Sequence, residues 1–191
     1  MISKWKTDSL KFTKYLFLND IETIDGNPFL QKHVFKYLNY KNRRLRLEYF
    51  IWGNDFFISR CRNSKNIFVD GTYHYPATFT QLLIIMYYDD LLLRKIPVFY
   101  ILMNNKSESA YNDIFKSVKE ILSFGLNYKF NFDTITTDNE DALNNSINKN
   151  FPHTQRISCY FHYQQLIERN AKKEGLAKKE LLEQTKLIIN I

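Results

Sequence analysis

Three apolar runs in the middle of the chain limit most strongly what this sequence can fold into. They span residues 67–73, 79–88 and 96–103, and they are rich in the β-branched and aromatic residues that are typical of strands. The polar connections between them are short, which favours an antiparallel meander. The sequence therefore predicts three antiparallel strands at the centre of the fold.

The hydrophobic periodicity changes after residue 106. Residues 107–124 carry apolar side chains with the spacing of one helical face, namely Tyr111, Ile114, Phe115, Val118, Ile121 and Leu122. Ser107 is a suitable N-cap for this helix, and Gly125 is a suitable end. Further along, residues 132–137 and 156–160 predict strands, whereas residues 139–150 and 162–173 predict helices.

The complete order is three strands, then a helix, a strand, a helix, a strand and a helix. This order is that of the ribonuclease H-like fold. The fold class predicted is therefore α/β, with a mixed sheet of three antiparallel strands and then parallel strands, flanked by helices. Hydrophobic residues make up 45% of the chain and aromatic residues 16%, which is enough for a buried core and excludes a disordered chain.

The region before residue 66 has a weaker pattern. Residues 29–38 predict a helix that begins after Asn27 and Pro28. Residues 47–58 are rich in aromatic side chains and predict two strands that turn at Gly53 and Asn54. We divide the chain into a basic N-terminal flanking segment at 1–45, the main domain at 46–175 and a C-terminal helix at 176–191 that begins a truncated insertion.

The positive charge of the chain is concentrated near its N-terminus. The formal net charge is +7, and residues 1–65 hold all of it, with 13 Lys and Arg against 6 Asp and Glu. The cluster is centred on Lys41, Arg43, Arg44 and Arg46, and such a patch attracts a polyanion, most commonly nucleic acid. We predict that Arg43, Arg44 and Arg46 bind DNA. The alternative is a solvated basic surface that aids solubility.

The cellular compartment can be inferred from what the sequence contains. Two cysteines, Cys61 and Cys159, form no disulfide framework and fit a reducing compartment. The first residues contain charges and no long apolar run, so no signal peptide is visible. The apolar stretch 82–88 is too short to span a bilayer. We expect a soluble intracellular protein, located in the nucleus if the organism is eukaryotic.

Two aspartates lie where a metal site is expected. Asp70 is in the middle of an apolar strand, where a charge is costly to bury without a partner. Asp138 directly follows strand 134–137, at a carboxyl end where ligands of open α/β sheets gather. In the predicted topology these strands are neighbours, so the two carboxylates converge, on the order of 4 to 8 Å apart, and suit Mg²⁺ or Mn²⁺. The alternatives are a helix cap for Asp138 and a turn or buried polar network for Asp70.

Four motifs together resemble the Mutator-like (MULE) transposase domain family. They are Phe-Val-Asp-Gly-Thr-Tyr at 68–73 with Pro76 and Phe-Thr-Gln-Leu at 79–82; Ile-Pro-Val at 96–98 with Asn-Lys-Ser-Glu at 105–108; Thr-Thr-Asp-Asn-Glu at 136–140 with Ala142; and Phe-Pro at 151–152 with Cys-Tyr-Phe-His at 159–162. Each motif alone is weak, but four of them in the family's order and spacing are fairly specific. The resemblance covers about residues 47–175.

The resemblance implies a ribonuclease H-like DDE transposase, which uses Mg²⁺ or Mn²⁺ to cleave and transfer DNA strands. Asp70 and Asp138 would be its first two catalytic and metal-binding acids. A third acid is expected from a later helix, and Glu168 and Glu174 are the candidates within this chain. The implied partners are transposon ends and target DNA, with a homo-oligomer as an open alternative.

A second hypothesis is a domesticated or truncated relative that binds DNA without catalysis. It would keep the fold and the basic cluster, and it would explain why neither a clear third acid nor an N-terminal zinc module is evident. With two acids alone, we expect no strand transfer from these 191 residues.

The Cys159 and His162 pair has the spacing of metal ligands, Cys-x-x-His. A structural zinc site needs about four ligands, and no second pair is evident in the sequence. We favour a buried thiol with a histidine that hydrogen-bonds near the start of a helix. The role of this motif therefore stays open.

Overall fold

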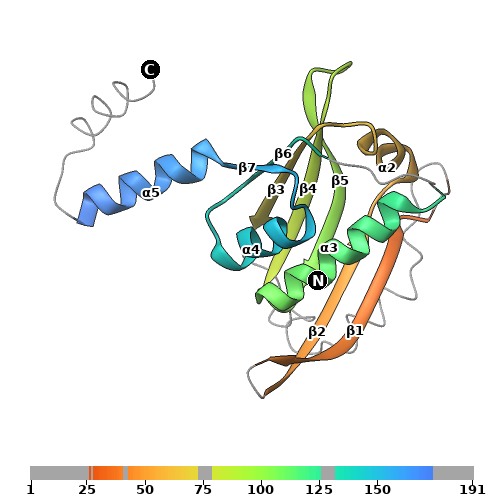
Figure 1. Cartoon of the computed structure of the whole chain (residues 1–191), viewed down its shortest axis with the longest axis horizontal. Coiled ribbons are helices and arrows are strands. Elements are labelled where there is room, and N and C mark those ends of the chain that lie inside the picture. The colour runs from red at the N-terminus through yellow and green to blue at the C-terminus, as the bar shows by residue number, and fades with distance from the viewer. Residues whose placement is uncertain (1–25, 27, 41–42, 73–78, 126–131, 174–191) are drawn as a thin grey trace, which may run out of the picture. The chain divides into compact units, whose positions relative to one another are not determined.

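The computed structural model describes residues 26, 28–40, 43–72, 79–125 and 132–173. Within these ranges seven strands form one sheet in the order β1-β2-β5-β4-β3-β6-β7 (Figure 1). The strands are β1 (Leu30–Tyr40), β2 (Arg43–Trp52), β3 (Asn66–Thr72), β4 (Gln81–Asp89), β5 (Arg94–Met103), β6 (Thr134–Thr137) and β7 (Gln155–Ser158). The helices are α2 (Asp55–Cys61), α3 (Glu108–Ser123), α4 (Asp141–Asn150) and α5 (Tyr160–Lys173).

The chain divides into two compact units, residues 1–157 and residues 158–191. The first unit holds α2, α3, α4 and nearly all of the sheet, and the second unit holds α5. No helix in the described ranges is long and apolar enough to cross a membrane.

The centre of the sheet has the predicted strand arrangement. β3, β4 and β5 form an antiparallel meander, in which Ile85 of β4 pairs with Val69 on one side and Phe99 on the other. β6 pairs with β3 in parallel, with Thr137 opposite Val69, and β7 follows β6 in the sheet. The succession β5-β4-β3-β6-β7 and the flanking helices confirm a mixed α/β fold of the ribonuclease H-like kind.

Helix α3 lies within the range that its periodicity predicts. The Ser107 hydroxyl accepts a hydrogen bond from the Ala110 backbone N–H at 3.3 Å, so Ser107 is the N-cap. The helix ends at Ser123, just before Gly125, which has a positive φ of 74°. These local signals agree with the hydrophobic spacing, which explains why this helix was predictable.

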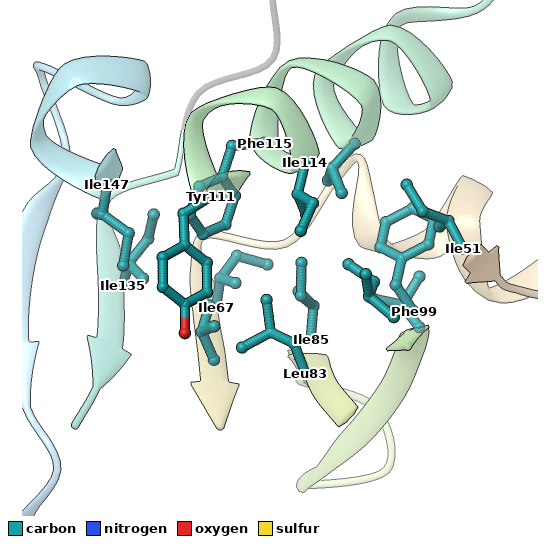
Figure 2. Packing of buried hydrophobic residues seen from close by; sticks show 14 of the residues in the cluster. Ile51, Ile67, Leu83, Ile85, Phe99, Tyr111, Ile114, Phe115, Ile135 and Ile147 are labelled. Carbon is teal, nitrogen blue, oxygen red and sulfur yellow. The ribbon is translucent and has the colours of Figure 1, made fainter. Parts of the chain in front are cut away.

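The main core lies between the sheet and the two helices α3 and α4. The buried residues of α3 include Tyr111, Ile114, Phe115, Val118 and Leu122. They pack against strand residues that include Ile51, Ile67, Leu83, Ile85, Phe99 and Ile135 (Figure 2). α4 contributes Leu143 and Ile147 to the same core. Burying each side chain of this size contributes about 1.5–3 kcal/mol, which fixes both helices on one face of the sheet.

The helix predicted at 29–38 is wrong, because these residues form β1. β1 pairs antiparallel with β2, for example Leu38 with Leu45. Its side chains alternate: Val34 and Leu38 pack against the main core, whereas Phe35 and Tyr37 are exposed. Apolar residues at positions 34, 35 and 38 also fit a helical spacing, so only the long-range partner strand decides between the two structures.

The strand pair predicted to turn at Gly53 and Asn54 is also wrong. β2 ends at Trp52, and Asn54 is the N-cap of α2, its side-chain oxygen accepting from the Phe56 N–H at 2.9 Å. Gly53 is needed for close packing, since a Cβ there would lie 2.7 Å from the Val98 carbonyl oxygen. The Gly-Asn pair therefore marks a helix start packed against β5, where the sequence suggested a hairpin turn.

Candidate functional site

Asp70 and Asp138 lie near the carboxyl ends of two neighbouring parallel strands. Val69 of β3 pairs with Thr137 of β6, and this is the last pair of their register. Each aspartate is the next residue along its chain, so continuing the register brings the two side by side. Neighbouring strands lie about 4.8 Å apart. The predicted neighbourhood of the two strands is confirmed, and the carboxylate separation of about 4 to 8 Å stays a prediction.

The alternation of buried residues indicates which face of the sheet carries these acids. Val69 and Ile135 are buried in the core beneath α3. Successive strand side chains point to opposite faces, so Asp70 lies on the face away from α3. Its Oδ1 atom is nevertheless buried. Asp138 follows the buried Thr137, the last residue of β6, so a continuation of this alternation would put Asp138 on that face as well.

Asp138 is not the N-cap of the helix that follows it. α4 begins at Asp141, and its N-cap residue is Glu140, whose side chain makes no capping hydrogen bond. Asp138 Oδ1 accepts a hydrogen bond from the Glu140 backbone N–H at 3.4 Å, the pattern of an Asx turn. The helix-cap alternative for Asp138 is therefore wrong, and its carboxylate belongs to the turn between β6 and α4.

A polar network lies on the α3 side of the same strands. The Tyr111 hydroxyl is 2.7 Å from Gln81 Oε1 and 3.1 Å from Glu140 Oε1. Lys106 Nζ is 2.9 Å from the other Glu140 carboxylate oxygen. Gln81 and Tyr111 are fully buried, and the Glu140 side chain is only 19% exposed. The network thus connects the start of β4, helix α3 and the turn before α4.

The hydrogen-bond chemistry gives this network a direction. Tyr111 has one hydroxyl proton and cannot donate to Gln81 and Glu140 together. The carboxylate is the stronger acceptor, so the proton is best placed toward Glu140. As placed, the buried Gln81 Nε2 has no acceptor among the described residues. If the Gln81 amide is turned so that its N–H donates to the Tyr111 hydroxyl oxygen, Nε2 gains a partner. Gln81, Tyr111 and Glu140 then form a relay in which each donor points to an acceptor.

Gly71 makes room for this network beside Asp70. A Cβ added at Gly71 would lie 1.7 Å from Gln81 Nε2 and 2.9 Å from its Cδ. The Gln81 amide therefore occupies the space that any other residue at position 71 would fill. The glycine that follows Asp70 is required by the close approach of a buried side chain.

Residues 66–165, slightly more than half of the chain, match the family model of the MULE transposase domain. The chain belongs to the MULE transposase domain family. No curated protein matches the chain. The matched stretch contains Asp70, Asp138 and the whole network of Gln81, Lys106, Tyr111 and Glu140.

The MULE domain has two acids that suit a divalent cation. Asp70 and Asp138 offer the hard oxygen ligands that Mg²⁺ and Mn²⁺ prefer. In the part of the chain that the structure describes, no three His, Cys, Asp or Glu side chains are grouped so that they could hold a metal ion. Glu168 is in α5, within the second unit, and Glu174 lies outside the described residues.

The Cys-x-x-His motif of the MULE domain stands at the start of α5. Cys159 is half-buried and lies between β7 and α5, and its carbonyl accepts from the Tyr163 N–H at 3.0 Å. His162 is half-buried in the first turn of the helix. No metal-binding group that includes this pair is found among the described residues. The thiol is not within a strand as predicted, and the role of the motif stays open.

The basic cluster belongs to the hairpin of β1 and β2. Arg43 is the first residue of β2, although its side chain lies outside the described part. The Arg44 guanidinium lies over the Tyr37 ring at 4.5 Å, and that of Arg46 lies over the Phe35 ring at 5.2 Å. The arginines are therefore interleaved with exposed aromatic rings.

Four side chains have a role that the sequence patterns did not indicate. Gln81, Lys106 and Glu140 were motif residues without an assigned role, and Tyr111 counted only toward the apolar face of α3. The sequence offered one signal, because Gln81 is a polar residue at the head of the most apolar strand. In the structure Gln81 is fully buried. A buried amide needs partners, but the sequence does not say which residues supply them.

Proposed function

We propose that this chain is the catalytic-core portion of a DNA transposase that cleaves and transfers DNA strands with divalent cations. Asp70 and Asp138 are assigned as its first two catalytic and metal-binding carboxylates. The observation that supports this most directly is the parallel register of β3 and β6, in which Val69 and Thr137 are paired one residue before each acid. This register lies within the stretch that matches a transposase family.

Mg²⁺ or Mn²⁺ is the cofactor that this donor set favours. Carboxylate oxygens are hard ligands, and the Oδ1 atom of Asp70 is buried, where a nearby cation would stabilise its charge. When bound, such a cation would activate the attacking oxygen and stabilise the leaving oxygen of a phosphodiester. Asp70 lies on the sheet face away from α3, and we assign Asp138 to the same face, so DNA would approach from that side.

The buried network would hold Asp138 in position. Lys106 and Tyr111 fix the Glu140 carboxylate from two directions. The backbone N–H of Glu140 in turn donates to Asp138 Oδ1. We therefore assign Gln81, Tyr111 and Glu140 as positioning residues, which orient a metal ligand without touching the metal.

A third carboxylate would have to come from the face of the sheet away from α3. Glu140 does not fit this role, because Tyr111 and Lys106 hold its carboxylate on the α3 side. Glu168 and Glu174 remain the candidates in this sequence, and a segment beyond them could also supply the acid. A carboxylate from such a segment would complete the ligand set of a two-metal site.

The family implies DNA as the partner, and we propose that the hairpin arginines contact it. Arg43, Arg44 and Arg46 would bind phosphates of transposon ends or target DNA, which gives affinity without sequence preference. In a eukaryotic cell this activity would take place in the nucleus.

A non-catalytic DNA-binding relative is the second candidate function. Unlike a two-metal site, this function does not require a group of three metal-ligating side chains, and the described residues contain none. Such a protein would keep the hairpin arginines and the fold, but it would bind Mn²⁺ weakly.

Calorimetric titration with Mn²⁺ distinguishes the two functions. We expect the chain to bind Mn²⁺, and Asp70→Asn or Asp138→Asn to lower the affinity on the order of a hundredfold, because even the partners of metal ligands cost about 10–100-fold when removed. Asp133→Asn is the matched control, since Asp133 is an exposed acid just before β6 that pairs with Lys65 at 3.8 Å. Equal affinities in all four proteins would favour the non-catalytic relative.

Cleavage activity is the second measurement. Mg²⁺- or Mn²⁺-dependent nicking of a DNA substrate that is lost in Asp70→Asn and kept in Asp133→Asn would support a complete catalytic site. From these 191 residues alone we expect Mn²⁺ binding without strand transfer. Robust nicking would instead assign a third ligand inside the chain, with Glu168→Gln and Glu174→Gln as the variants to compare.

A further inference from the structure

The β1–β2 hairpin has one face that is tied to the rest of the first unit. Lys36 pairs with Asp113 of α3, and Lys32 Nζ is 2.6 Å from Glu120 Oε2 of the same helix. Val34 on this face packs against the main core. The charges and apolar groups of this face are therefore already used within the protein.

The opposite face of the hairpin carries large rings in contact with solvent. Phe35 is 52% exposed and Tyr37 is 51% exposed. Their rings meet edge to face, with centroids 5.9 Å apart. Adjacent exposed apolar side chains form a contiguous patch, and such patches mark interaction sites more often than single exposed residues do.

Two arginines alternate with these rings. The register pairs Tyr37 with Arg46, and each guanidinium lies over the ring on the diagonal, Arg44 over Tyr37 and Arg46 over Phe35. Arg46 also pairs with the buried Glu48. Arg44 has no acidic partner among the described residues, so its charge is available to an anion. We call the set Phe35, Tyr37, Arg44 and Arg46 the hairpin face.

The row of rings continues inward but ceases to be accessible. His33, which is next on this face, stacks on Phe50 with centroids 4.2 Å apart, and Phe50 stacks on Trp52. The His33 side chain is only 16% exposed, and Phe50 is fully buried. The inner rings therefore anchor the row, whereas the outer two are open to a ligand.

The spacing on the hairpin face selects between single-stranded and duplex DNA. Residues two apart on a strand are separated by about 6.6–6.8 Å, twice the rise of about 3.4 Å per nucleotide in a duplex strand. Paired bases are stacked on each other at that shorter spacing and leave no ring face open. Unpaired bases can separate and stack on aromatic rings or on guanidinium planes, while the arginines attract the phosphates.

We propose that the hairpin face is a stacking platform for the unpaired bases of single-stranded DNA. This inference rests on the proposed function, since strand cleavage and transfer produce unpaired DNA. It goes further by naming the form of DNA and the side chains that select it. The arginines supply affinity for any DNA backbone, and Phe35 and Tyr37 supply the preference for unpaired bases.

The test compares the binding of a fluorescent oligothymidine and of a duplex of equal length, measured by anisotropy with the full chain. Phe35→Val and Tyr37→Thr keep strand propensity and change exposed positions. Each should weaken oligothymidine binding at least about fivefold, because stacking contributes about 1–3 kcal/mol per base, and should change duplex binding less than about twofold. Phe56→Leu is the matched control, since Phe56 is an exposed ring beneath Arg60 at 5.8 Å and is not part of the hairpin face.

A second measurement changes the DNA strand, with the unmodified chain as the binding protein. An abasic strand of the same length keeps the phosphates and removes the bases, so the unmodified chain should bind it as weakly as the Phe35→Val, Tyr37→Thr double variant binds oligothymidine. Equal binding of abasic and thymidine strands would overturn the inference. So would aromatic variants that change self-association in sedimentation but leave oligothymidine affinity intact.

The outcomes also separate this inference from the proposed function. If Arg44→Ala and Arg46→Ala weaken binding to both DNA forms while the aromatic variants change neither, the stacking platform is wrong and the DNA-binding function stands. If the unmodified chain binds neither form of DNA, both proposals fail.

Discussion

The strand ends around Asp70 and the hairpin face are both candidate functional regions, but they are built in opposite ways. Near Asp70 the polar groups are buried, and the Tyr111 hydroxyl is hydrogen-bonded to both Gln81 and Glu140. On the hairpin, Phe35 and Arg44 are exposed and alternate along a strand pair. Single substitutions in the first region should cause large, coupled losses of stability and Mn²⁺ affinity. Substitutions on the hairpin face should cause small, additive losses of DNA affinity.

The largest effect is expected from Gly71→Ala. The new methyl group would collide with the buried Gln81 amide, which cannot move without breaking its hydrogen bond to Tyr111. We expect the free energy of unfolding, measured with urea, to fall by about 1–3 kcal/mol, and Mn²⁺ binding to weaken with it.

A double variant tests whether the collision is the cause. In the Gln81→Ala variant the obstructing amide is absent. Adding Gly71→Ala to this variant should therefore lower the free energy of unfolding by at least about 1 kcal/mol less than Gly71→Ala does in the unmodified chain. If the losses in free energy of unfolding of the two single variants add up to that of the double variant, Gly71 is required for a reason other than its close approach to Gln81.

The next effect is that of Tyr111→Phe, which removes the hydroxyl between Gln81 and Glu140. We expect Mn²⁺ affinity to fall by about tenfold, because the turn that holds Asp138 loses a support. Tyr49→Phe is the matched control: the Tyr49 hydroxyl also bonds to α3, at 2.7 Å from Asp113 Oδ2 and 2.8 Å from Ser117 Oγ, but these partners are not members of the network. If both variants weaken Mn²⁺ binding equally, the effect is one of general stability.

A smaller effect is expected at the hairpin. The slope of log affinity for duplex DNA against log salt should become shallower by about 0.9 for each phosphate contact removed by Arg43→Ala, Arg44→Ala or Arg46→Ala. Lys36→Ala lies on the other face, where Asp113 already neutralises the lysine, and should change the slope much less. An unchanged slope in the arginine variants would show that the cluster is only a solvated surface.

The smallest effect concerns the reactivity of the two cysteines and needs no substitution. Cys61 lies in the core and Cys159 in the second unit. Burial raises the pKa of the Cys61 thiol to about 12, so the thiol stays neutral at pH 8. Because this pKa is raised, the neutral thiol contributes to the free energy of unfolding. This contribution is fully present below about pH 8.5, the ordinary thiol value, and is lost as the pH rises toward 12. Iodoacetamide at pH 8 should modify Cys159 and spare Cys61, as peptide mass spectrometry can show; equal rates would mean that the core opens readily.

Local sequence patterns predicted the secondary structure correctly wherever a pattern fits a single local structure. The apolar run of β4, the capped periodic helix α3 and the strand before Asp138 all followed from the sequence. The patterns failed at residues 29–38 and at Gly53, where the same residues fit two local structures. At both places a distant strand decides: β2 pairs with residues 30–40, and β5 packs against Gly53.

The sequence by itself determined the family, the order of the central elements and the two aspartates as candidate ligands, because each depends on residue type and spacing along one strand or helix. Only the tertiary structure decided that Gln81, Tyr111 and Glu140 meet, since they come from a strand, a helix and a turn that are far apart in the chain. It also decided that Phe35 and Tyr37 are exposed beneath Arg46 and Arg44, because that face exists only once β1 and β2 are paired. Contacts of this kind depend on long-range packing, which the periodicity of a single segment does not encode.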